Sequence, residues 1–187
     1  MITPKRSDFT MRPVTEGDID LLLEWKNSDR IRTTMFEHNL VLREEHLRWF
    51  HSLKDNELQK CWIFEHQGRT IGRINIKNVN RADDVWIWGC HLGPLVDPAL
   101  FCPRAGTIMG FCALEHFFEK LGVTKVIGEA LAANKRSLEF NARIGFNTEK
   151  FFTKVTSRGE PIEAVLLTLT KTEWLQRKAE VEKTAFL

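Results

Sequence analysis

The sequence contains no tyrosine, although it has six tryptophans and thirteen phenylalanines. No side chain can therefore act as a phenolic acid or base, a role that only tyrosine fills. Cysteine is scarce as well: Cys61, Cys90, Cys102 and Cys112 lie inside apolar runs, without the paired spacing of a zinc site. We expect reduced core thiols rather than disulfides, and no metal site.

A strong charge and a long apolar run are also missing. The net charge is +2, which is too small to indicate nucleic acid binding. No run is long enough to span a membrane, and the start MITPKRSDF lacks the apolar core of a secretory signal. We therefore expect a cytoplasmic protein without nucleic acid or membrane partners. The 187 residues suit a single domain with loose termini at 1–7 and 176–187.

The hydrophobic pattern predicts a chain in which strands alternate with helices. Strands are expected at 9–14, 61–66, 70–77, 85–92, 123–131, 146–156 and 162–170. Helices are expected at 15–27, 43–53, 105–121 and 134–144, and a polar helix or tail at 171–182. Helix 105–121 would carry an apolar and a polar stripe and connect two parallel strands. We thus predict an α/β (α+β) fold with a mixed, mostly antiparallel sheet of six to seven strands and helices on both faces.

The stretch from 85 to 121 is the strongest candidate for a binding site. A strand leads through a loop into a helix, and the first backbone N–H groups of a helix are free to bind an anion. The small residues Ala105, Gly106 and Thr107 would let a phosphate approach the main chain.

Two blocks in the second half of the chain resemble the GNAT superfamily of acetyl-CoA-dependent N-acetyltransferases. They are Arg104-Ala105-Gly106 before a helix, and Asn134-x-x-Ser137 followed by Gly145-Phe146. The resemblance extends over about residues 11–170. It implies acetyl-CoA as co-substrate, a small-molecule amine as acceptor, and no metal.

The first half of the chain resembles one branch of this superfamily, the enzymes that acetylate nucleotide-linked amino sugars. The matching residues are Glu24-Trp25-Lys26-Asn27, Arg32 and Glu45-His46-x-x-Trp49-Phe50. Acetyltransferases of protein N-termini and ribosomal proteins share parts of these blocks and are the alternative. A non-catalytic module that binds acyl-CoA is a further alternative.

The resemblance also implies which residues hold acetyl-CoA. Backbone groups of Cys90, His91 and Leu92 would bind the pantetheine arm, and Asn134 would bind the same region. The pyrophosphate would be held by N–H groups of the loop and helix start, namely Arg104, Ala105, Gly106, Thr107 and Ile108. The family's phosphate loop has two glycines; the first falls on Arg104 here, and only the second, Gly106, is kept.

For the transfer step, the resemblance implies Glu129 as the base that accepts the proton of the amine. Asn141 stands where family members have the tyrosine that protonates the CoA thiolate, so an amide would steady the leaving sulfur instead. A solvated strand-end carboxylate is the alternative for Glu129, and a proton relay or simple packing are the alternatives for the His91 side chain.

The acceptor itself is expected near residues 27–35. Asn27, Arg30, Arg32 and Met35 are the candidate substrate-binding residues, and Arg30 and Arg32 could equally be solvated loop charges. The last hairpin could pair its edge with a second copy, which makes a homodimer possible.

Overall fold

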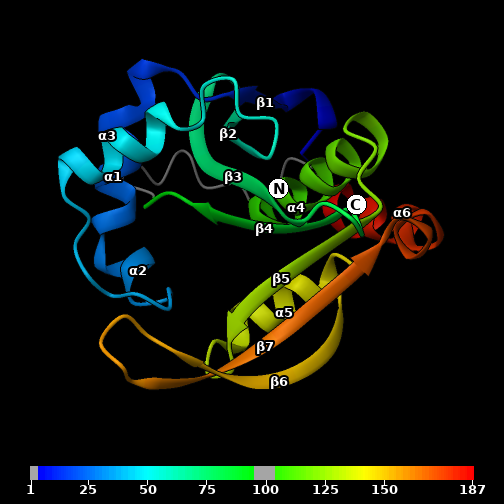
Figure 1. Cartoon of the computed structure of the whole chain (residues 1–187). Helices are drawn as coiled ribbons and strands as arrows, with labels where there is room; N and C mark the ends of the chain where they lie inside the picture. Colours follow the sequence, from blue (N-terminus) through cyan, green and yellow to red (C-terminus); the bar gives the residue numbers. More distant parts are fainter. Residues whose placement is uncertain (1–3, 95–103) are drawn as a thin grey trace.

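The computed structural model describes residues 4–94 and 104–187 of the chain (Figure 1). Seven strands form one sheet in the order β1-β2-β3-β4-β5-β7-β6. Their bounds are β1 Phe9–Pro13, β2 Gln59–His66, β3 Arg69–Asn80, β4 Val85–Leu92, β5 Lys125–Leu131, β6 Asn147–Val155 and β7 Pro161–Thr170. All neighbouring strands are antiparallel except β4 and β5, which are parallel. The predicted mixed, mostly antiparallel sheet is confirmed.

Helices cover both faces of this sheet (Figure 1). Their bounds are α1 Ile19–Asn27, α2 Asp29–Arg32, α3 Arg43–His51, α4 Ala105–Glu115, α5 Lys135–Arg143 and α6 Lys171–Phe186. Short helical turns are η1 Arg6–Asp8 and η2 Glu16–Asp18, and a π-helical turn η4, His116–Lys120, extends α4. Among residues 4–94 and 104–187, none of these helices combines the length and the apolar character that crossing a membrane requires.

The two faces have separate apolar clusters. The larger cluster joins α4, α5 and α6 to the sheet, and the smaller one joins α1 and α2 to Ile63 of β2, with Trp49 of α3 packed against it. Glycine ends the two helices where it was predicted, because Gly122 (φ 73°) and Gly145 (φ 104°) adopt the positive φ that favours this residue.

The sheet opens between its two parallel strands. β4 and β5 pair at only three positions, the last of which is Ile87 with Ile127. Beyond them β4 stays paired with β3 as far as Leu92, and β5 stays paired with β7 as far as Leu131. The facing edges of β4 and β5 therefore diverge, as Figure 1 shows, and have no strand partner there. We call this feature the β4–β5 opening.

Trp88 lies where the two strands begin to diverge. Its ring stacks on Phe146 with 5.5 Å between the ring centroids and 7° between the planes. Its Nε1 atom would be only 3.3 Å from a Cβ placed on Gly128 of β5. A glycine at position 128 therefore makes room for the indole beside β5.

Helix α4 is buried over most of its length, which differs from the predicted two-sided helix. Most of its residues are buried: Ala105, Thr107, Ile108, Met109, Gly110, Phe111, Ala113 and Leu114. The polar stripe is confined to the end of the helix and to η4, because α6 covers the outer side. There the Phe111 ring lies 5.7 Å from the Trp174 ring.

The expected loose ends are wrong for the described part of both termini. At the C-terminus, α6 is an ordered helix in which Trp174, Val181 and Ala185 are at most 3 % exposed. Thr170 and Glu173 form a reciprocal cap at its start. At the N-terminus, Arg6 forms an ion pair with Glu115 of α4. Residues 1–3 lie outside the described part.

Candidate active site

The predicted strand–loop–helix stretch places the end of β4 beside the start of α4. A Cβ on Gly106 would lie 3.9 Å from Cδ1 of Leu92, the last residue of β4. The first turn of α4 contains no acidic residue. Among residues 4–94 and 104–187, no side chain caps the N–H groups of Ala105 and Thr107, as an anion site at a helix start requires.

Arg104 precedes this helix with a φ of 68°, in the left-handed region of the backbone. An L-residue adopts this conformation at a cost, whereas glycine adopts it freely. The resemblance aligns Arg104 with the family's first glycine, and the φ of Arg104 lies in the region that glycine adopts freely.

The predicted pantetheine residues on β4 lie at the edge of the β4–β5 opening, and their side chains point to opposite faces of the sheet. Cys90 packs against the larger apolar cluster, where burial raises the pKa of its thiol to about 12. The thiol therefore stays protonated near neutral pH and is not an activated nucleophile. His91 lies on the other face, against Trp25 of α1, with 5.9 Å between the ring centroids.

Two asparagines of the predicted site belong to α5 and its start. The side-chain oxygen of Asn134 accepts the N–H of Ser137 at 3.1 Å and so caps the helix. Asn141 is buried and donates to the Ser137 carbonyl oxygen at 2.8 Å. Its Oδ1 would lie 3.8 Å from a Cβ on Gly128, beside the start of the opening.

Glu129 lies on the face of β5 that α5 does not cover. It forms an ion pair with Lys154 of β6, and the Lys154 ammonium lies 4.4 Å from the ring centroid of Phe36. The predicted base therefore has a cationic partner, and the segment after α2 reaches across to this pair.

The same segment is attached to the tip of the β6–β7 hairpin. Glu37 accepts hydrogen bonds from the backbone N–H and the hydroxyl of Ser157, at 2.8 and 2.6 Å. Arg158 donates to the side chain of Asn39. We call residues 33–39 the strap, because they connect α2 with the far side of the β4–β5 opening.

The four predicted substrate-binding residues have different environments. Asn27 exchanges two hydrogen bonds with the backbone of Val41, and Met35 packs on the smaller apolar cluster. Arg32 donates to the His38 carbonyl oxygen and to Asp29. These three side chains stabilise the segment itself. Arg30 reaches the end of β4, where it donates to the Gly93 carbonyl oxygen at 3.2 Å.

A group of polar residues that the sequence did not single out as a site surrounds His91. Arg73 of β3 is its cross-strand partner, and Lys26 of α1 is close enough for its charge, like that of Arg73, to lower the pKa of His91. Burial is the larger cause, and the pKa falls to about 3, so the imidazole is neutral near neutral pH. One signal was present in the sequence, since Lys26 falls on the apolar side of its helix.

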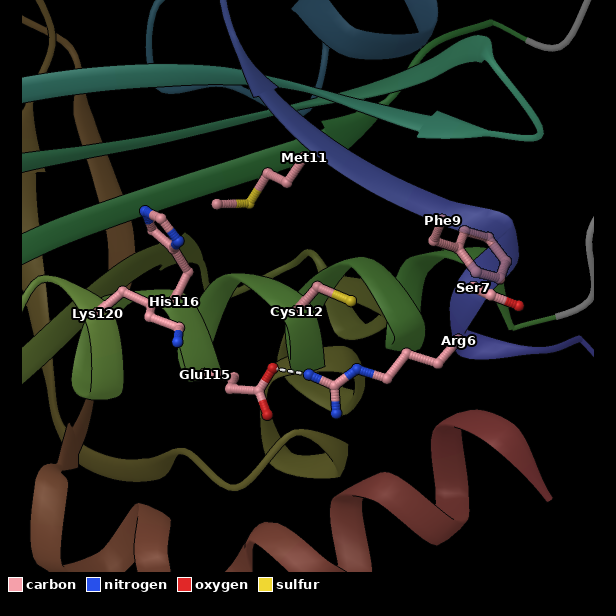
Figure 2. A pocket seen from close by; sticks show the side chains of 8 residues that line it. All are labelled: Arg6, Ser7, Phe9, Met11, Cys112, Glu115, His116 and Lys120. Carbon is pink, nitrogen blue, oxygen red and sulfur yellow. Dashed lines mark hydrogen bonds and ion pairs between the residues drawn. The ribbon is translucent and has the colours of Figure 1, made fainter.

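Two surface hollows are lined by other residues. Figure 2 shows one of about 500 Å³ between β1 and α4, where Arg6 points toward the Glu115 carboxylate. A larger one of about 780 Å³ lies by the end of α3 and the start of β2. No predicted site residue lines either hollow. Within the described ranges, no three His, Cys, Asp or Glu side chains are grouped so that they could hold a metal ion. Cys102 lies outside those ranges.

Known proteins were compared with this chain and its fold. A spermidine N-acetyltransferase from Vibrio cholerae, solved with CoA and spermine, has a TM-score of 0.79 and 16 % identity, with 90 % of this chain and 99 % of that one covered. A putative acetyltransferase from T. thermophilus has a TM-score of 0.73 and 17 % identity, with 95 % and 93 % covered. At such identities these structures establish the fold alone.

Sequence comparison gives a relative and a family. The uncharacterized protein MJ1062 of Methanocaldococcus jannaschii is 21 % identical over 155 residues, which cover 77 % of this chain but only 29 % of that protein. The chain thus spans less than a third of the length of this curated relative. A family model, the acetyltransferase (GNAT) domain, matches residues 8–147. This match extends over well more than half of the sequence, so the chain belongs to the GNAT acetyltransferase family.

Proposed function

We propose that the protein transfers an acetyl group from acetyl-CoA to a primary amine, and that the acceptor is a nucleotide-linked amino sugar. The observation that carries the acetyl-CoA half is the β4–β5 opening. In the described part of the chain, it combines a backbone edge on β4 that has no strand partner with a start of α4 that no side chain caps. A strand edge suits the amide groups of a pantetheine arm, and a helix start suits a diphosphate. These residues therefore fit acetyl-CoA.

Each predicted cofactor residue has a backbone task in this proposal. Cys90, His91 and Leu92 offer main-chain groups to the pantetheine arm, and the residues from Arg104 to Ile108 offer N–H groups to the pyrophosphate. The amide nitrogen of Asn134 has no partner among the described residues, so it can bind the arm while its oxygen caps α5. Bound acetyl-CoA supplies an activated acetyl group as a thioester.

The acceptor half of the proposal uses the opposite side of the opening. The neutral amine attacks the thioester carbonyl, and Glu129 takes its proton directly or through a water molecule. N–H groups of β4 polarise the carbonyl oxygen. Asn141 steadies the departing sulfur if its amide turns from Ser137, and a thiolate is stable enough near neutral pH to leave without a phenol.

The test is an assay of free thiol release from acetyl-CoA with a panel of amines. The panel contains nucleotide-linked amino sugars, spermidine, and peptides with free N-termini. We expect release with the amino sugars at kcat values in the range of ordinary enzymes, roughly 1 per second or more. Thiol release with spermidine alone would indicate that this chain acetylates a polyamine, as the Vibrio enzyme does. Thiol release with peptides alone would indicate that the acceptor is a protein N-terminus. Tight CoA binding without release for any amine would indicate a non-catalytic module.

The edge strand β6 is the candidate interface for the predicted homodimer. β6 is an edge strand of the sheet, and its Phe151 and Val155 are 69 % and 65 % exposed. Such an edge favours pairing with another strand, so a dimer through β6 is part of the proposal.

A further inference from the structure

Four polar side chains with unused hydrogen-bonding groups meet on the face of β3 and β4 that α1 and α3 cover. They are Lys26, Arg73, Asn75 and His91. We propose that they form a binding site for an oxyanion, a phosphate or a carboxylate, that the amine acceptor carries. We call this group of four side chains the cationic recess. The inference rests on the proposed acetyl transfer and defines the chemical class of its acceptor.

The positions of these residues follow from the strands. Arg73 and His91 are directly opposite each other on β3 and β4, and Asn75 lies two residues further on the same face of β3. The Asn75 side-chain oxygen would be 3.4 Å from a Cβ on Gly89, which is two residues before His91. Lys26 approaches from α1, where burial and the charge of Arg73 lower its pKa.

The unused groups are the main evidence for a ligand. Both ring nitrogens of His91 are buried, and neither has a hydrogen-bond partner in good geometry among the described residues; the backbone of Leu92 is close enough only to raise the pKa of the imidazole slightly against the larger effect of burial. Buried polar atoms in folded proteins nearly always have a partner. Within the same ranges, the Lys26 ammonium and the Asn75 amide also make no hydrogen bond or ion pair, so the recess offers several free donors at once.

Arg73 is held in place as a preformed donor. Its guanidinium lies 4.8 Å from the ring centroid of Trp49, and its Nε donates to the sulfur of Cys61 at 3.3 Å. Its two terminal nitrogens remain without a protein partner in the described part of the chain. A guanidinium fixed in this way binds carboxylate or phosphate with little loss of side-chain freedom.

Acidic side chains do not neutralise these cations. Glu45 is the acid whose charge acts on Lys26, and it is exposed. Among the described residues, no acidic side chain forms an ion pair with Lys26 or Arg73. A polyamine would meet uncompensated positive charge here, whereas an anionic acceptor would be attracted.

The distance from the recess to the opening limits the acceptor. Arg73 lies one strand away from β4, and neighbouring strands are about 5 Å apart. The anionic group and the reactive amine should therefore be separated by roughly 5 to 10 Å. An amino sugar with a phosphate or a carboxylate on another ring position has this span.

Kinetics with matched acceptors test the proposal. Glucosamine 6-phosphate carries a phosphate and muramic acid carries a carboxylate. Glucosamine has the same amine but neither anionic group. We expect Lys26→Gln and Arg73→Gln to raise KM for the anionic acceptors by about 10-fold or more, the effect of losing a hydrogen bond to a charged group. KM for glucosamine should not change. The control is Lys77→Gln, which removes the same charge from an exposed position on β3 and should alter neither value.

A binding experiment separates this inference from the proposed function. The imidazole signals of His91, assigned with His91→Gln, are followed by NMR while inorganic phosphate or acetate is added to the protein with and without CoA. A saturable shift that weakens in Lys26→Gln supports the recess, even if no amine is acetylated and the proposed function fails. The anion that produces the shift distinguishes phosphate from carboxylate recognition. Absence of a saturable shift with either anion, or an equal rise of KM for all three sugars, would overturn the inference.

Discussion

Glu129 is the residue on which the proposed chemistry depends most. The resemblance gave it the role of base, and the structure adds the ion pair with Lys154 and the nearby Phe36 ring. An ammonium next to a carboxylate fixes its orientation, but it also competes for the lone pairs that would accept a proton. Lys154 therefore has to share or release Glu129 when the amine enters.

Replacing Glu129 tests the base directly. Glu129→Gln keeps the size of the side chain and removes the proton acceptor, so kcat should fall by about 100-fold or more. Lys154→Met is the matched variant, because it removes the partner and leaves the carboxylate, and it should retain most of the turnover. Steady-state kinetics from pH 6 to 9 is the measurement. A Glu129→Gln enzyme with kcat near that of the wild type across this range would show that the base lies elsewhere.

Single residues were also where prediction from sequence was weakest. Asn27 and Arg32 are candidates because they belong to the blocks that resemble the amino-sugar branch, and because Arg32 could pair with Arg30 on a phosphate group. Their partners, Val41, His38 and Asp29, belong to the same segment, and a side chain that bonds its own loop has no distinct pattern. In the sequence, Arg73 and Asn75 are simply the polar residues of a strand with alternating polar and apolar positions. They could not be linked to His91, because only the register of β3 with β4 places Arg73 opposite it.

Among the elements, the start of α4 combines a backbone conformation that suits glycine with an arginine side chain. The resemblance aligns Arg104 with a glycine of the family pattern, and a φ of 68° is a conformation that suits glycine. The arginine then adds a positive charge beside the free N–H groups of the helix start, which favours an anion there.

Two substitutions at this position separate backbone strain from charge. Arg104→Ala and Arg104→Gly both remove the guanidinium, so both should weaken CoA binding by a similar factor in calorimetry. Only glycine relieves the left-handed conformation, so the glycine variant should be more stable than the alanine variant by about 1 kcal/mol. Urea denaturation measures this difference. Equal stabilities would mean that the helix start does not hold this conformation in solution.

Helices and strands whose apolar residues recur at regular spacing were predicted well. A very short helix and a helix covered by another helix were not. The seven strands and the helices 43–53 and 134–144 have counterparts at nearly the same positions. Helix α2 was missed because four residues are too few to show a period. The buried character of α4 was missed because its outer side is covered by α6, and α6 is too polar in composition to reveal its inward residues.

Across the whole molecule, α6 completes the larger apolar cluster instead of extending as a tail. Trp174 is fully buried, and its Nε1 donates to Glu119 at 3.2 Å. Lys178 adds ion pairs with Glu115 and Glu119. The last helix is therefore expected to contribute to global stability, not only to local order.

Two neighbouring positions on α6 provide the test. Trp174→Ala should lower the free energy of unfolding by about 3 to 5 kcal/mol, because it leaves a large cavity against α4. Leu175→Ala is the control, since Leu175 is 57 % exposed and its loss should cost no more than about 0.5 kcal/mol. Chemical denaturation of both variants gives the values. A similar small change in the free energy of unfolding for both variants would show that α6 is only loosely attached to the rest of the protein.

The strap has one consequence for how a substrate arrives. Arg30 connects α2 to the end of β4, and Glu37 and Asn39 connect the strap to the β6–β7 hairpin. The hairpin is connected through β7 to β5, and β5 is paired with β4 just before Trp88. These contacts therefore form a closed path around the acceptor side of the opening. For an acceptor that binds on this side, such a closed path of contacts favours an amine at the tip of the molecule, which can enter end-on, over an amine in the middle of a polymer.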